Sequence, residues 1–160
     1  MTINIGDKIP STTLFHMTET GVTKITTDEL FAGKKVVLFA LPGAYTPTCS
    51  ALHLPGFVMS ANRLFEKGID SIVCLSVNDP YVMAAWGEQH NVADKVSMIA
   101  DGNAEFTRAI GLEIDRSESG MGLRSQRYAM IVNNGTVELL NVEAFGKFEV
   151  SDAETIYNSL

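Results

Sequence analysis

The sequence predicts an α/β fold in which a mixed central β-sheet is flanked by helices on both faces. Three continuous apolar runs have the length and the β-branched composition of strands buried on both faces, as in a parallel sheet: residues 35–41, 71–77 and 96–100. Helical patterns separate these runs, so strands and helices alternate along the chain. Asn134-Gly135 lies between two further apolar runs, at 127–132 and 136–142, and predicts an antiparallel hairpin.

The N-terminal third is expected to contain short extended pieces and one short helix. The extended pieces lie at residues 11–17 and are followed by a turn at Thr20-Gly21. Thr26 and Glu29 have the spacing of a capping box, which predicts that a helix begins there and ends at Gly33.

A long helix is predicted between the first two buried strands. Pro42-Gly43 ends the first strand, and Thr46-Pro47 is typical of an N-cap followed by proline at the first helical position. The apolar pattern then continues to about Lys67-Gly68. Pro55 is expected to bend this helix, because its ring collides with the carbonyl of Ala51.

Capping residues place the later elements. Asn78-Asp79-Pro80 begins another helix, whose apolar residues have the spacing of core packing rather than of a ligand site: Val82, Met83, Ala85 and Trp86. A helix at 104–110 should end at Gly111. Residues 113–125 are expected to form a loop, and Ser151 with Glu154 to begin a C-terminal helix.

Composition excludes several classes of protein. The 160 residues are 46% apolar and show no repeat or linker, so residues 1–160 are expected to form one domain. A net charge of −7, with only 12 Lys and Arg spread along the chain, argues against nucleic-acid binding. No apolar run is long enough to span a membrane, and the N-terminus does not resemble an export signal. Two cysteines are too few for a disulfide scaffold, so we expect a cytoplasmic protein whose cysteine chemistry needs no metal or cofactor.

Cys49 is the candidate nucleophile. If Thr46 is the N-cap, Cys49 lies in the first helical turn, where unpaired N–H groups and the helix dipole favour an anion such as a thiolate. The dipole contributes only about 0.3 to 1 kcal/mol, so a nearby cation is also required. We expect this sulfur to be reachable from solvent.

The pattern Pro42-x-x-x-Thr46-x-x-Cys49 resembles the active-site motif of the peroxiredoxins. Longer segments resemble the type II branch found in plants and bacteria: residues 42–50, 53–57, 75–80, 100–102, 122–128 and 141–143. The resemblance covers nearly the whole chain, and it implies a thioredoxin-like fold and reduction of hydrogen peroxide and organic hydroperoxides. Cys49 would attack the peroxide and become a sulfenic acid.

The resemblance also assigns the residues around the sulfur. Pro42 would shield the site, and Arg127 would be the required cation. Because cleavage of an O–O bond builds negative charge on the departing oxygen, the site needs fixed donors. The Thr46 hydroxyl, the guanidinium of Arg127, and the backbone N–H groups of Thr48 and Cys49 could supply them.

The source of the reducing thiol differs from that of some relatives. No cysteine follows Cys74, so the C-terminal resolving cysteine of some peroxiredoxins has no match. The glutaredoxin domain that another relative carries is not expected in a chain of this length. The resemblance therefore implies an external reductant, either glutathione with glutaredoxin or thioredoxin, and a homodimer packed near the active site.

Other residues have two interpretations. Cys74 lies within an apolar strand and is expected to pack in the core, the alternative being a resolving or regulatory thiol. His53 lies four residues after Cys49 on the same helical face and is expected to make structural hydrogen bonds, the alternative being proton handling. Arg124 is expected to be a solvated or supporting charge.

Two other functions compete with the peroxidase. A thiol-disulfide exchanger usually carries a Cys-x-x-Cys pair, which this chain lacks. A redox sensor would keep the fold but pass its oxidation to a partner, so it would react once and stall instead of turning over.

Overall fold

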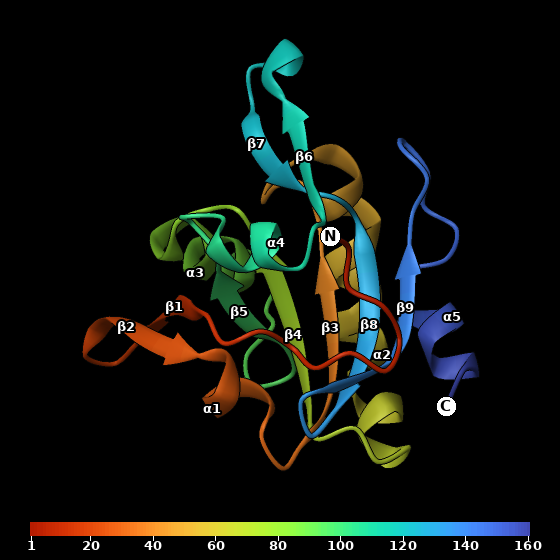
Figure 1. The fold of residues 1–160 in the computed structure, drawn as a ribbon. Coiled ribbons are helices and arrows are strands. Elements are labelled where there is room, and N and C mark those ends of the chain that lie inside the picture. The colour runs from red at the N-terminus through yellow and green to blue at the C-terminus, as the bar shows by residue number, and fades with distance from the viewer.

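The computed structural model describes residues 1–160 and contains one large sheet. Its strands are β1 (Thr13–Thr18), β2 (Gly21–Thr26), β3 (Lys35–Ala40), β4 (Ser71–Ser76), β5 (Ser97–Ala100), β8 (Tyr128–Asn133) and β9 (Thr136–Val142). The strand order is β2-β1-β5-β4-β3-β8-β9 (Figure 1). β3, β4 and β5 are parallel, whereas β1, β2, β8 and β9 pair in antiparallel fashion. The predicted mixed sheet is therefore confirmed.

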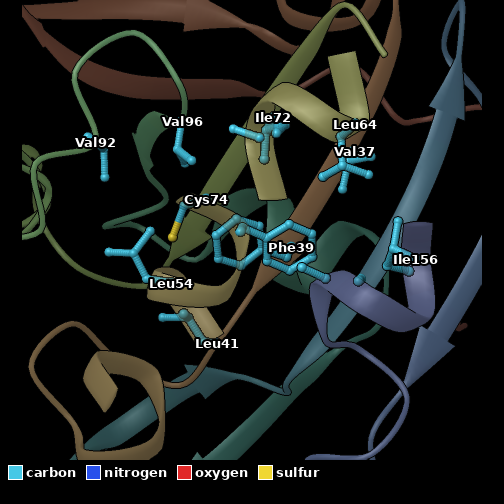
Figure 2. Packing of buried hydrophobic residues seen from close by; sticks show 14 of the residues in the cluster. Val37, Phe39, Leu41, Leu54, Leu64, Ile72, Cys74, Val92, Val96 and Ile156 are labelled. Carbon is cyan, nitrogen blue, oxygen red and sulfur yellow. The ribbon is translucent and has the colours of Figure 1, made fainter. Parts of the chain in front are cut away.

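Helices cover both faces of this sheet, as predicted. They are α1 (Thr27–Phe31), α2 (Leu54–Glu66), α3 (Pro80–Gln89), α4 (Glu105–Ala109) and α5 (Ala153–Asn158). One core cluster contains buried residues of α2, α3 and α5, and the other contains those of α1 and α4. Val37 and Phe39 of β3 belong to the first cluster, shown in Figure 2, and Val36 and Leu38 belong to the second. Alternate side chains of β3 thus enter opposite cores, as expected of a strand buried on both faces.

Several predicted helix ends and turns are confirmed. Thr26 and Glu29 form the capping box of α1, and the Asp79 side chain accepts a hydrogen bond from the N–H of Val82 at the start of α3. Asn134 and Gly135 have φ angles of 48° and 80°, as a two-residue hairpin turn of type I′ requires. None of the helices combines the length and the apolar composition that crossing a membrane requires.

Two antiparallel segments were not predicted. Residues 113–125, expected as a loop, form a hairpin of β6 (Glu113–Arg116) and β7 (Gly122–Ser125), joined by a 3-10 turn at Ser117–Ser119. Figure 1 shows this pair projecting beyond the large sheet. β2, at the edge of the large sheet, was also missed. Both segments contain no fully buried stretch, so they lack the apolar run that marks β3 and β4.

The predicted start of the C-terminal helix is wrong by one residue. Asp152, not Ser151, is the N-cap of α5, and its carboxylate accepts hydrogen bonds from the N–H and the hydroxyl of Thr155. The Ser151 hydroxyl is not free to cap, because it donates to the carboxylate of Glu143 at 2.7 Å. Its partner Glu143 lies eight residues earlier in the chain, outside the span of a local capping pattern, so the pattern could not reveal the contact.

Candidate active site

The sheet register brings two distant segments together at one end of β3. Ala40, the last residue of β3, pairs with Tyr128, the first residue of β8. Arg127 therefore lies beside the loop that leaves β3 and leads to Cys49. Its Nη2 donates a hydrogen bond to the Sγ of Cys49 at 3.1 Å, across 78 residues of sequence. The predicted approach of a guanidinium to this sulfur is confirmed.

The helical segment that holds Cys49 begins at Pro47, as predicted, but its first turns are irregular. Residues Cys49–His53 form a π turn in which the N–H of Leu54 bonds to the carbonyl of Cys49. Pro55 follows at once and has no N–H, so a carbonyl one turn earlier lacks its usual donor there. The expected effect of Pro55 therefore takes the form of a widened turn at the cysteine.

Thr46 does not cap the helix through its side chain, contrary to the prediction. Its hydroxyl donates instead to the carbonyl of Gly43 at 2.7 Å, while its own carbonyl accepts from the N–H of Ser50 at 2.9 Å. The hydroxyl thus braces the loop that enters the helix. Its oxygen still has acceptor capacity, because one hydroxyl can donate and accept together.

The expectation that the sulfur is exposed is wrong for this conformation. Cys49 is 0% exposed and belongs to the core cluster on the α2 side of the sheet. A cavity of about 350 Å³ lies next to it, and Pro42, Thr46, Thr48 and Arg127 are among its lining residues. The sulfur therefore lies behind side chains that line the cavity.

His53 holds the guanidinium from its other side. Nη1 of Arg127 lies 2.9 Å from Nδ1 of His53, and because arginine only donates, Nδ1 is the acceptor. The proton is then on Nε2, which donates to the carbonyl of Ser151 at 3.0 Å. Burial, together with the charge of Arg127, lowers the pKa of His53 from 6.5 to about 3. A neutral histidine with both nitrogens engaged supports the structural interpretation over proton handling.

This buried histidine predicts a pH dependence of stability. Between pH 6.5 and about 3 the unfolded chain binds a proton at His53 and the folded chain does not, so the free energy of unfolding falls as the pH falls through this window. The loss is on the order of several kcal/mol. His53→Gln, which cannot titrate, should show a shallower decline in denaturant unfolding measured across the same pH range.

His16→Gln is the matched control, because it removes a histidine in β1, three strands from β3 in the sheet. Its unfolding curve should follow the wild-type pH dependence. Equal slopes for the wild type and His53→Gln would contradict a neutral, buried His53.

The loop at Pro42 is held by two side chains from elsewhere in the chain. Arg124 donates to the carbonyl of Pro42 at 3.2 Å and to that of Met121 at 2.9 Å. The Asn78 side chain accepts from the N–H of Ala44 at 3.0 Å. Arg124 is thus a supporting charge rather than a solvated one, and its contact with Pro42 had no signal in the sequence.

Cys74 is 0% exposed in the middle of β4, where it pairs with Phe39 and Met98 on the neighbouring strands. Burial raises its pKa well above the usual value, and the nearby Cys49 adds to the effect. The neutral thiol therefore packs in the core, and Trp86 is likewise fully buried. No group of three or more His, Cys, Asp or Glu side chains is arranged to hold a metal ion.

Comparison with known proteins decides the family. Residues 4–157 match the family model described as Redoxin. The chain is 45% identical to Peroxiredoxin-2C of Arabidopsis thaliana over 99% of this chain and 98% of that protein. This chain belongs to the peroxiredoxins of the redoxin family.

Other relatives agree. The peroxiredoxin is 50% identical over 138 residues to Peroxiredoxin sll1621 of Synechocystis, covering 82% of this chain and 72% of that protein. Its fold matches the crystal structure of reduced Prx3 in complex with H2O2 from Vibrio vulnificus with a TM-score of 0.96, at 54% identity and 99% coverage of both chains. The predicted resemblance to type II peroxiredoxins and the thioredoxin-like fold are confirmed.

As a peroxiredoxin, the chain is a thiol-dependent peroxidase and an oxidoreductase with an antioxidant role. The structure gathers five of the sequence-predicted residues at one place: Pro42, Thr46, Thr48, Cys49 and Arg127. His53 joins them through Arg127, whereas Cys74 packs within β4, in the core cluster that also contains Cys49. Sequence reasoning missed the Ser151 carbonyl that holds His53, because a backbone acceptor has no sequence signature.

Proposed function

We propose that Cys49 is the thiolate that attacks the peroxide, and that Pro42, Thr46 and Arg127 complete the catalytic site. The observation that carries this proposal is the 3.1 Å contact between Nη2 of Arg127 and Sγ of Cys49. A charge-assisted donor at that distance favours the anionic sulfur. No other cysteine of the chain has such a neighbour, because Cys74 is enclosed by apolar strands.

The reaction follows from this arrangement. The sulfur attacks one peroxide oxygen, an S–O bond forms and the O–O bond breaks. The departing oxygen takes up a proton to leave as water or an alcohol, and Cys49 becomes a sulfenic acid. The sulfur is oxidised while the peroxide is reduced. The Arg127 guanidinium and the N–H groups of Thr48 and Cys49 would stabilise the charge on the two oxygens, and the Thr46 hydroxyl would orient them.

The reducing thiol is proposed to come from outside the chain. Cys74, the only other cysteine, is fully buried in β4, so it is closed to solvent thiols, and its raised pKa disfavours the thiolate that attack on an oxidised Cys49 requires. Glutathione with glutaredoxin, or thioredoxin, would then reduce the sulfenic acid and release water.

Mass spectrometry after one equivalent of peroxide tests this proposal. With a sulfenic-acid trap present, we expect one adduct on Cys49 and none on Cys74. Turnover with excess glutathione and glutaredoxin, compared with turnover with thioredoxin, then identifies the reductant. A Cys49–Cys74 disulfide in place of the adduct would contradict external reduction, and a single turnover with every reductant would favour the redox sensor.

We also propose a cytoplasmic homodimer. Two apolar side chains beside the site support a self-association surface, because Tyr45 is 50% exposed and Leu52 is 56% exposed. Two free cysteines suit a reducing compartment. Sedimentation over a dilution series should show a dimer that dissociates, and a monomer at every concentration would contradict this part of the proposal.

A further inference from the structure

The carboxylate of Glu143 lies at the centre of a cluster of hydrogen bonds outside the catalytic residues. Glu143 follows β9 and is only 8% exposed. Its carboxylate accepts from the backbone N–H groups of Glu149, Val150 and Ser151 at 2.8 to 2.9 Å, and from the Ser151 hydroxyl at 2.7 Å. The segment from 143 to 151 is therefore closed on itself by one side chain.

These bonds lead back to Arg127 by two routes. The backbone N–H of Glu143 donates to the carbonyl of Arg127 at 2.9 Å. The Ser151 carbonyl accepts from Nε2 of His53 at 3.0 Å, and Nδ1 of His53 accepts from Nη1 of Arg127 at 2.9 Å. The contacts thus form a closed ring that begins at the backbone of Arg127 and ends at its guanidinium.

The ring depends on the carboxylate of Glu143 accepting hydrogen bonds only. Burial raises the pKa of its carboxyl group, but the bonds from Ser151, Glu149 and Val150 outweigh burial and lower it overall. An ionised carboxylate has no proton to donate, so the Ser151 amide and hydroxyl both face it. The Ser151 backbone is then fixed with its carbonyl directed at His53.

We propose that Glu143 is a positioning residue for the peroxidase reaction: it fixes the Ser151 carbonyl, which holds His53 with its proton on Nε2 and so aims the Arg127 guanidinium at Cys49. The same hydrogen bonds to the Glu143 carboxylate close the loop of residues 144–148, which form part of the cavity wall. This inference rests on the proposed roles of Cys49 and Arg127. Glu143 itself touches neither the sulfur nor the guanidinium nitrogens.

Glu143→Gln tests this role of the carboxylate. Glutamine keeps one oxygen in the place of Oε2, but its NH2 group replaces Oε1 and opposes the N–H of Glu149. The remaining oxygen is neutral, so its bonds to the Ser151 amide and hydroxyl weaken and the Ser151 carbonyl should lose its fixed direction. Because a misplacement of about 1 Å at a reacting group can reduce a rate about a hundredfold, we expect the stopped-flow rate constant for Cys49 oxidation to fall by about tenfold or more. Glu149→Gln is the matched control, since it removes the same charge from an exposed neighbour and should change the rate by less than about twofold.

A double-mutant cycle separates positioning from a general loss of structure. If Glu143 acts through His53, Glu143→Gln should add less than about twofold in a His53→Gln background. Nitrogen NMR of His53, recorded without peroxide, should show the Nε2–H tautomer in the wild type and a mixture in Glu143→Gln. An unchanged rate, an unchanged tautomer, or the same tenfold loss in both backgrounds would overturn the inference.

Two safeguards keep the result interpretable. If Glu143→Gln does not fold, Ser151→Ala takes its place, because it removes the hydroxyl that donates to Glu143. The rate should then fall by about threefold, which corresponds to the energy of about one hydrogen bond. An unchanged rate would overturn the inference. Failure of the proposed function looks different, because Cys49→Ser would then retain peroxide consumption while the His53 tautomer still reported on Glu143.

Discussion

Cys49→Ser is expected to abolish peroxide consumption. A serine hydroxyl is not ionised at neutral pH, even beside a guanidinium, so the variant lacks the nucleophile that forms the S–O bond. Loss of a nucleophile in other enzymes reduces turnover by a factor of about a million, so we expect at least about a thousandfold loss here. Stopped-flow measurement of peroxide disappearance, with excess reductant, gives the rate directly.

Cys74→Ala is the control for this experiment. It removes the other thiol from β4 and leaves Cys49 with its Arg127 contact, so the rate with peroxide should stay close to that of the wild type. A thermal unfolding measurement on each variant shows whether the fold is retained. Peroxide consumption that survives in Cys49→Ser but disappears in Cys74→Ala would show that Cys74 is the nucleophile instead.

Arg127→Met should produce the second largest loss. The variant removes the donor 3.1 Å from the sulfur and the only cation that hydrogen-bonds to it. Loss of one such donor in other enzymes reduces the rate by a factor of about 100 to 1000, and we expect a similar loss in the rate constant for Cys49 oxidation.

Arg127→Lys should recover only part of this loss. A single ammonium group keeps the charge, but it lacks the planar fork that bonds Cys49 and His53 together. Arg108→Gln is the control, because this exposed arginine of α4 bonds only to the carbonyl of Asn103. An Arg127→Lys variant with the full wild-type rate would show that charge alone suffices and that the geometry of the guanidinium is unimportant.

The buried parts of the fold were predictable from sequence because burial leaves a pattern. β3 and β4 are enclosed on both faces, so nearly every residue in them is apolar and the runs stand out. Caps such as Asp79 are local, since the side chain accepts a hydrogen bond from an N–H only three residues further along the chain. The hairpin of β6 and β7 was missed because its strands are short and partly exposed, so no apolar run identifies them.

The site was predictable only in part. The position of Cys49 near a helix start follows from local sequence, but the pairing with Arg127 came from family resemblance, since no local pattern joins residues 78 positions apart. The burial of the sulfur was not foreseen, because the packing of residues 49–53 into the core has no local sequence signal. The contacts of Ser151 with Glu143 and His53 depend on how β9 and the segment before α5 meet in space, which periodicity does not encode.

The register between Ala40 and Tyr128 has a consequence for a chain that is still being synthesised. Until β8 has emerged from the ribosome and joined the sheet, Cys49 has no guanidinium beside it and remains an ordinary thiol of low reactivity. Peroxide should therefore spare incomplete chains and oxidise only those whose sheet has closed. Sensitivity to the oxidant would then begin only once β8 has joined the sheet.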